Sequence, residues 1–143
     1  MNKIILFGRG GLASFLSQHK KEETEILAYL DTRDSRRKMI NGIPVIGIEK
    51  LNDYMYDYIV VAFSDVKWGF KILENQGIPE EKIVGYSFNE PKPYAVNEFQ
   101  QIVNKVLNVE LKNGKITTLF DIPRKNFYLC TMNELESDVV ESD

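Results

Sequence analysis

The sequence predicts an α/β fold, a three-layer sandwich in which helices cover both faces of a parallel sheet. Short apolar runs alternate with helix-like segments from residue 3 to about residue 88, as expected for strands joined by crossover helices. The run at 56–63 is almost continuous in β-branched and aromatic residues, which is typical of a central strand buried on both faces. With right-handed crossovers, five parallel strands follow in the order 3-2-1-4-5.

The first elements form a unit with a recognisable layout. An apolar strand at 3–7 runs into a glycine-rich turn and a helix at 11–19, whose apolar residues recur at helical spacing. A second strand at 25–30 ends on Asp31, about 23 residues after Gly8. Strand, turn, helix, strand and terminal acid at these distances indicate a dinucleotide-binding β-α-β unit.

Each of these residues has a structural or chemical role in such a unit. Gly8 permits the tight turn out of the strand, and Gly10 lets the backbone approach a phosphate. Ala13, in the place of the third glycine, lets the helix pack against the sheet. Free N–H groups at the helix start favour an anion, and Asp31 can accept hydrogen bonds from ribose hydroxyls. The alternative is a sheet that keeps the tight turn for packing and binds nothing there.

Further elements follow along the chain. The predicted segments are a third strand at 42–47, a short helix at 48–54, the fourth strand at 56–63, a helix at 66–76 capped by Ser64 and Asp65, and a fifth strand at 81–86. Pro44 lacks an N–H, so the third strand should be the outermost strand of its half of the sheet.

The composition changes at a proline-containing connector, residues 89–93. We expect residues 1–88 to form the nucleotide-binding domain and residues 94–143 to form a C-terminal extension packed on it. The extension should contain a helix around 99–107, a hairpin turn at Asn113-Gly114, an apolar run at 127–131 and an acidic tail from about 134.

Composition bounds the class of protein. Hydrophobic residues make up 43% of the 143 residues, which is a globular composition. The net charge of −3 argues against non-specific binding to nucleic acid. Cys130 is the only cysteine, which excludes an intrachain disulfide and a four-cysteine metal site, so no metal is expected. Without a secretory signal or an apolar run long enough to span a bilayer, the sequence predicts a soluble cytoplasmic protein.

The candidate ligand crevice lies at the carboxyl ends of the first, second and fourth strands, where the strand order reverses. The predicted binding residues are Gly8, Arg9, Gly10, Gly11, Leu12, Asp31, Thr32, Arg33, Ala62, Phe63 and Ser64. Phe63 either stacks on a base or belongs to the core, and Ser64 either donates to a phosphate or only caps the next helix.

The arginines near Asp31 give a second ambiguity. Arg33, Arg36 and Arg37 follow it closely, and arginine there can pair with a 2′-phosphate, as in NADP binding. Asp31 would repel that phosphate, so a solvated basic loop is the simpler interpretation. Arg9, inside the glycine loop, can reach a pyrophosphate or face solvent.

The absent motifs limit the chemistry. The sequence has no Tyr-x-x-x-Lys pair, no phosphate-binding P-loop and no Gly-x-Ser-x-Gly elbow. His19, the only histidine, follows a helix beside two lysines and is interpreted as a surface residue. Catalytic residues therefore remain unassigned. If the protein is an enzyme, it is an NAD(P)-dependent nucleotide-sugar dehydrogenase or epimerase-like protein without a visible catalytic dyad of its own.

Three segments together resemble a known group: Ile5–Gly11, Ile26–Asp31 and Gln76–Val84, with the strands at 43–47 and 56–62 between them. They are similar to the small Rossmann-like, CoA-binding-like domain of bacterial surface-polysaccharide proteins. Relatives include nucleotide-sugar dehydratases and epimerases and the N-terminal domains of sugar acyltransferases. In the acyltransferases, the glycine loop and the acid after the second strand face a UDP-sugar. The resemblance implies this role for Gly8, Gly10, Gly11 and Asp31. The acyltransferase loop usually carries a histidine where Leu12 stands, and the catalytic β-helix has no counterpart after residue 88.

The resemblance implies a nucleotide or nucleotide-sugar binding protein of bacterial surface-polysaccharide metabolism, with NAD(P) or a UDP-sugar as ligand. The main alternative is a non-catalytic interaction or regulatory module that partners a glycosyl-, acyl- or methyltransferase. In that case the C-terminal segment would pair with another copy, forming a homo-oligomer, or with a catalytic partner. A third alternative is an oxidoreductase whose catalytic groups come from another chain.

Overall fold

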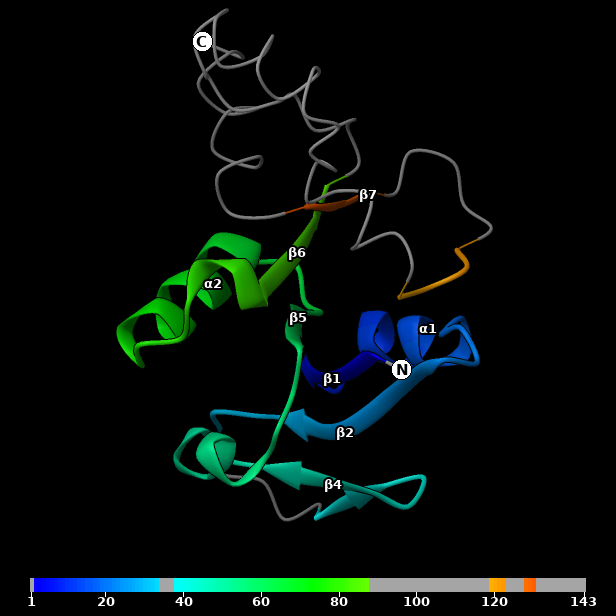
Figure 1. The fold of residues 1–143 in the computed structure, drawn as a ribbon, viewed down its shortest axis with the longest axis horizontal. Helices are drawn as coiled ribbons and strands as arrows, with labels where there is room; N and C mark the ends of the chain where they lie inside the picture. Colours follow the sequence, from blue (N-terminus) through cyan, green and yellow to red (C-terminus); the bar gives the residue numbers. More distant parts are fainter. Residues whose placement is uncertain (1, 34–37, 88–118, 123–127, 131–143) are drawn as a thin grey trace, which may run out of the picture.

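A seven-stranded sheet, in the order β3-β4-β2-β1-β5-β6-β7, runs through the centre of the computed structural model (Figure 1). The structure describes residues 2–33, 38–87, 119–122 and 128–130. The strands are β1 (Asn2–Phe7), β2 (Thr24–Leu30), β3 (Met39–Ile40), β4 (Ile43–Ile46), β5 (Tyr58–Val61), β6 (Ile83–Ser87) and β7 (Tyr128–Cys130). The helices are α1 (Gly11–Gln18) and α2 (Val66–Asn75), with two 3-10 helices, η1 (Ile48–Asp53) and η2 (Glu80–Lys82).

The sheet is larger than the sequence predicted. The five expected strands are β1, β2, β4, β5 and β6, and they pair in parallel as β4-β2-β1-β5-β6. The predicted order 3-2-1-4-5 is nevertheless not that of the whole sheet. Two additional strands, β3 and β7, extend it at both edges and are antiparallel to their neighbours.

The prediction that Pro44 lies on an outermost strand is wrong. Strand β3 lies outside β4, and Met39 is paired with Pro44. The pairing tolerates the missing N–H of proline because the next residue supplies a bond, with Val45 N donating to Lys38 O at 2.8 Å. The two turn residues, Asn41 and Gly42, have φ angles of 50° and 81°, as a two-residue hairpin requires.

The helices lie on opposite sides of the sheet (Figure 1). Side chains alternate along β1, so Ile4 and Leu6 pack with α1 while Ile5 and Phe7 pack with α2 and η1. Each face of the sheet therefore has its own apolar core, and the predicted three-layer arrangement is confirmed for the described residues. The segment predicted as a short helix at 48–54 is the 3-10 helix η1.

Short pieces of the C-terminal part join this framework. Thr24 Oγ1 donates to Leu119 O at 2.8 Å, and Asp121 N donates to His19 O at 2.8 Å. Strand β7 falls within the predicted apolar run and pairs with β6. The predicted helix at 99–107, the turn at Asn113-Gly114 and the acidic tail lie outside the described residues.

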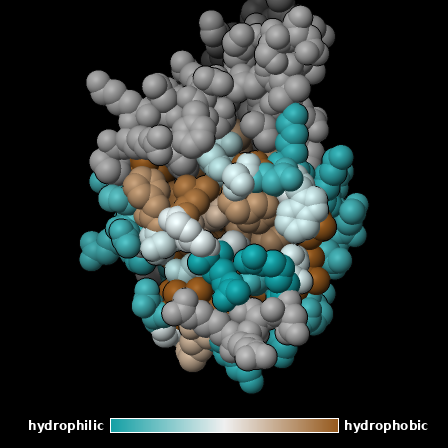
Figure 2. All heavy atoms as spheres, turned by 180° about the vertical axis from the view of Figure 1, so that it is seen from behind, coloured by the Kyte–Doolittle hydropathy of each residue, from teal (hydrophilic) through white to brown (hydrophobic). Residues whose placement is uncertain are grey.

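The surface mixes polar and apolar groups. Figure 2 shows the reverse face, where hydrophobic groups lie among hydrophilic ones. Three large hydrophobic side chains in the described part of the chain are exposed, namely Met39, Met55 and Trp68. Within that same part, no helix combines the length and the apolar character needed to cross a membrane.

Candidate functional site

A pocket of about 530 Å³ opens at the carboxyl ends of β1, β2 and β5. All eleven predicted binding residues line it. Its other lining residues are Phe7, Leu30, Asp65 and Trp68. Strand β1 has β2 as its neighbour on one side and β5 on the other, so the strand order runs outward from β1 in both directions. The pocket therefore lies at the switch point of the sheet.

Gly8 makes the turn out of β1 and is required there for two reasons. Its φ of +124° is in a region that side chains rarely adopt. A Cβ atom at this position would also lie 2.9 Å from Ala62 O, at the end of β5. The N–H of Gly8 donates to Leu30 O at 2.9 Å, so it joins the loop to β2 and is not available to a ligand.

The rest of the glycine loop is open. A Cβ atom on Gly10 or Gly11 would meet nothing within 4 Å, so the space in front of both residues is empty of protein. Gly10 is the N-cap of α1 and supplies no side-chain cap. The N–H groups of Arg9 and Gly10 have no acceptor among the described residues. The first N–H groups of α1 are also unsatisfied by the geometry of a helix start, and such groups attract anions.

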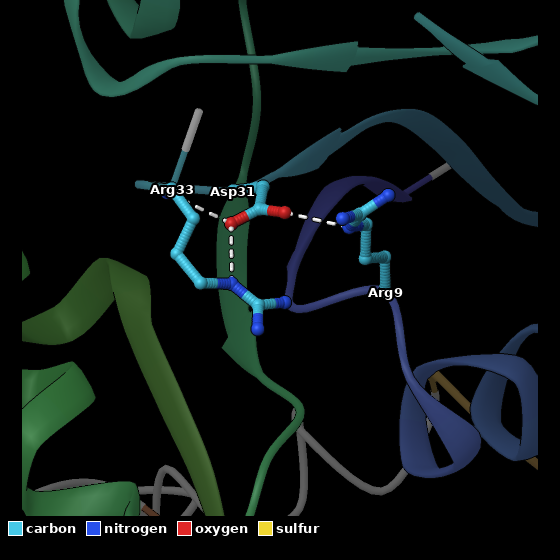
Figure 3. Close-up of polar contacts among 3 residues, drawn as sticks. All are labelled: Arg9, Asp31 and Arg33. Carbon is cyan, nitrogen blue, oxygen red and sulfur yellow. Dashed lines mark hydrogen bonds and ion pairs between the residues drawn. The ribbon is translucent and has the colours of Figure 1, made fainter. Parts of the chain in front are cut away.

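Asp31, which follows β2, contacts two arginines, one of them from this loop (Figure 3). Its Oδ1 accepts hydrogen bonds from Arg33 N at 2.9 Å and from Arg33 Nε at 3.3 Å. Its Oδ2 lies 2.6 Å from Arg9 Nε. The Arg9 contact is an ion pair rather than an aligned hydrogen bond, since Oδ2 accepts no hydrogen bond of acceptable geometry from the described residues. The carboxylate is thus flanked by two guanidinium groups, which leave one net positive charge.

The charge on Asp31 is stabilised despite burial. Burial by itself raises the pKa of Asp31, but the hydrogen bonds from Arg33 and the positive charges of Arg33 and Arg9 outweigh it, and the pKa lies below its usual value. The side chain of Asp31 is only 6% exposed, whereas those of Arg9 and Arg33 are 27% and 76% exposed. An ionised acid is therefore present in the pocket over the physiological pH range.

Aromatic rings form the wall beside β5. Phe7 and Phe63 meet edge to face with centroids 4.8 Å apart, and Phe63 lies 5.6 Å from the Trp68 ring. Phe63 thus packs on a core residue and also lines the pocket, so both sequence-based interpretations of it describe part of its environment. The expectation that Ser64 helps to cap α2 is wrong, because Asp65 is the N-cap and its Oδ1 accepts from Trp68 N at 3.2 Å. Ser64 is exposed at the pocket.

Sequence reasoning missed three lining residues, namely Phe7, Leu30 and Trp68. Phe7 and Leu30 are the last residues of their strands, and Trp68 lies in the first turn of α2. A systematic reading of strand ends and following helix starts would have found them, because ligands bind at these positions in open parallel sheets.

Other chemically distinctive residues lie away from the pocket. The His19 and Phe15 rings contact each other at a tilt of 56° with centroids 4.7 Å apart, and Cys130 is buried in β7. Arg36 and Arg37 lie outside the described residues. No cluster of potential metal-binding side chains occurs in the described ranges. A second depression, lined by Lys3, Tyr56, Asp57, Lys82 and four neighbours, lies at the amino ends of the strands.

A family model described as C2185-like, N-terminal, matches residues 1–84. The chain belongs to the C2185-like family. The match covers more than half of the 143 residues and spans every residue predicted to bind a ligand. The C2185-like region therefore contains the complete pocket described above.

Comparison with solved structures gives a distant likeness. UDP-D-quinovosamine 4-dehydrogenase from Vibrio fischeri is 16% identical, with a TM-score of 0.47, over 94% of this chain and 97% of that protein. A likeness this distant carries no functional argument. No curated protein sequence gives a significant match.

Proposed function

We propose that this protein binds a nucleotide or nucleotide-sugar, with NAD(P) and UDP-sugars as the candidate ligands. The observation that carries the proposal is the open glycine loop at the switch point of the sheet. There, unsatisfied N–H groups at the start of α1 face a pocket of about 530 Å³. Small-molecule sites commonly have volumes of about 300–1,000 Å³. The diphosphate of the ligand would lie against Gly10 and Gly11, where the protein leaves space.

The charges around the loop support an anionic ligand. Arg9 belongs to the loop itself, and its Nε lies 2.6 Å from Asp31 Oδ2. Because Nε makes this contact, the two terminal nitrogens of the guanidinium remain for a phosphate oxygen. Asp31 therefore positions the Arg9 guanidinium for contact with the diphosphate. Without an arginine beside it, the carboxylate of Asp31 would repel a diphosphate.

Asp31 also supports recognition of a sugar ring. Its Oδ2 accepts no aligned hydrogen bond from the described residues, but this oxygen is buried beside Arg9 Nε. A hydroxyl of the sugar attached to the diphosphate can donate to this oxygen when the Arg9 side chain moves from Asp31 to the diphosphate. Thr32, next to Asp31 and exposed at the pocket, offers a second hydroxyl partner.

The proposed context is bacterial surface-polysaccharide or nucleotide-sugar metabolism, on the strength of the resemblance of residues 3–88 to domains of such proteins. In this context, residues 1–88 form the nucleotide-binding domain. The extension from residue 94 provides contacts with another copy of the chain or with a catalytic partner.

Thermal unfolding with and without ligand tests the proposal. NAD, NADP, UDP, UDP-sugars and coenzyme A are added separately, and the melting temperature is recorded. A ligand at about 100 times its Kd stabilises the native state by about 2.7 kcal/mol. For a domain of this size, that corresponds to a rise in Tm on the order of 10 °C. No rise with any of these compounds would contradict the proposal and favour an interaction module.

Variants localise any response to the pocket. Asp31→Ala should abolish or strongly reduce the rise in Tm, because the variant loses the acceptor for the sugar hydroxyl and the anchor of Arg9. Asp53→Ala is the matched control, since Asp53 is an exposed acid that does not line the pocket. An equal response in wild type and Asp31→Ala would refute this assignment of the site.

A further inference from the structure

Trp68 has an unusual position for a large aromatic residue. It lies in the first turn of α2, its surface is 45% exposed, and it lines the pocket. Burying an indole ring is strongly favourable, so an exposed one in a pocket offers surface that a ligand can cover. It is also the only tryptophan of the chain.

The backbone of α2 fixes the indole at this place. Asp65 caps the helix by accepting a hydrogen bond from Trp68 N. Gly69 allows the helix to press against β5, since a Cβ atom there would lie 2.6 Å from Val61 Cγ1 and 2.9 Å from Phe63 Cζ. The first turn of α2 is therefore fixed by a cap and by a close contact with β5. The position of Trp68 thus does not depend on a bound ligand.

Neighbouring rings support the indole from within the protein. Its ring centroid lies 5.6 Å from that of Phe63 and 6.2 Å from that of Phe7. Both rings are tilted against the indole, which is partly exposed and lines the pocket. Such an arrangement is a platform on which a planar ring can stack.

The aromatic platform and the pair Asp31 and Arg33 lie on different sides of β1. Asp31 and Arg33 follow β2, whereas Phe63 and Trp68 follow β5, and both strands are direct neighbours of β1. Adjacent strands are about 4.8 Å apart, so the two strands that precede these groups, β2 and β5, lie about 10 Å apart with the glycine loop between them. A dinucleotide or a nucleotide-sugar spans this distance, with its diphosphate on the glycine loop, the sugar on one side of the diphosphate beside Asp31 and the planar ring on the other side beside Trp68.

We propose that Trp68 binds the aromatic ring of the nucleotide by stacking, with the phosphates on the glycine loop and Arg9. This inference rests on the proposed function and adds the orientation of the ligand: its ring-bearing end lies beside β5 and α2. Stacking tolerates different bases because every base has a flat face. Selectivity among bases therefore comes from polar groups and not from Trp68.

The single tryptophan makes the test direct. Wild-type protein is titrated with UDP and with NAD, and binding is followed by calorimetry and by the fluorescence of Trp68. The indole emission should change and saturate with the same Kd as the heat. Pyrophosphate, which has no ring, serves as the matched probe and should leave the emission unchanged where it binds.

Variants separate stacking from structure. Trp68→Ala should weaken nucleotide binding by about 5-fold to 100-fold. Trp68→Phe, which retains a ring, should stay within a few-fold of wild type, and Lys71→Ala on the exposed part of the same helix should bind normally. Each variant is checked for folding by circular dichroism, and the wild-type fluorescence result stands even where Trp68→Ala is unstable.

The outcomes distinguish this inference from the proposed function. If calorimetry shows nucleotide binding that leaves the wild-type emission unchanged, the stacking role is wrong and the proposed function stands. Equal nucleotide affinity of the wild type and of a folded Trp68→Ala variant would also show that the stacking role is wrong, while the proposed function stands. If neither nucleotide binds the wild-type protein at all, the proposed function fails, and the stacking role fails with it.

Discussion

Nε of Arg9 lies 2.6 Å from Oδ2 of Asp31, which joins the loop after β1 to the residue that follows β2. The contact brings a cation to the mouth of the pocket and adds to the hydrogen bonds and charge of Arg33, which together lower the pKa of Asp31 against the effect of burial. It also explains an ambiguity of the sequence, in which Asp31 argued against a phosphate ligand and the nearby arginines argued for one. The acid and two of the arginines form one group with a net positive charge.

The two ion pairs of Asp31 should differ in strength. Arg9 is 27% exposed and Arg33 is 76% exposed, so the solvent screens the Arg33 pair more. Double-mutant cycles of Asp31→Asn with Arg9→Gln and with Arg33→Gln, measured by urea unfolding, should give the larger coupling energy for Arg9. We expect on the order of 1 kcal/mol for Arg9 and less for Arg33. A larger coupling to Arg33 would show that its hydrogen bond to Asp31 outweighs the effect of screening and would contradict this prediction.

Stability should depend on the charge of Asp31 at acid pH. The pKa of Asp31 is lower in the folded protein than its usual value of 3.8. A lowered folded-state pKa stabilises the protein above the unfolded-state pKa, and this stabilisation is lost as the pH falls through the folded-state value. The difference in the free energy of unfolding between wild type and Asp31→Asn should therefore be constant near neutral pH and shrink below about pH 4. A difference that grew on acidification would have the wrong sign.

Two glycines of the same loop should respond differently to alanine. Gly8→Ala forces a Cβ atom to 2.9 Å from Ala62 O at a φ of +124°, so we expect destabilisation of about 1–3 kcal/mol. Gly10→Ala meets no atom within 4 Å and should change the free energy of unfolding little. Because the diphosphate is proposed to lie against Gly10, the same substitution should weaken ligand binding. Equal stability of the two variants in urea would show that the turn is not as described.

Gly69 should be intolerant of alanine although it lies inside a helix. Alanine is intrinsically better than glycine in a helix by about 1 kcal/mol. Here its Cβ would lie 2.6 Å from Val61 Cγ1, so overpacking should outweigh that gain and destabilise the protein by about 1–3 kcal/mol. Lys71→Ala, at an exposed position of α2, is the control in the same thermal unfolding experiment. A rise in Tm for Gly69→Ala would mean that α2 packs less closely on β5.

Local sequence patterns predicted the parallel core because each of its strands is an apolar run and each turn has a glycine or a cap. The first β-α-β unit is the clearest case, since strand, glycine turn, helix and acid follow at fixed distances. The pocket followed from the same reasoning, because strand ends converge at one edge of a parallel sheet.

Other features depend on contacts that local patterns do not encode. Strand β7 pairs with β6 over more than 40 positions of chain, and no periodicity specifies such a partner. Strand β3 is only two residues long, but the Asn41-Gly42 turn beside it is a hairpin signal that the sequence contained. The ion pair between Arg9 and Asp31 depends on side-chain geometry at a turn. From the sequence, a contact with a pyrophosphate and a position facing solvent were both open for Arg9.

The central claim is that a phosphate-bearing nucleotide lies on the open part of the glycine loop. Backbone amide shifts of ¹⁵N-labelled protein, recorded during titration with UDP and with NAD, test it most directly. The account predicts that the largest shifts with at least one ligand fall on Arg9, Gly10, Gly11 and Leu12. Saturable shifts confined to the depression around Tyr56 and Lys82, or no saturable shift with either ligand, would contradict it.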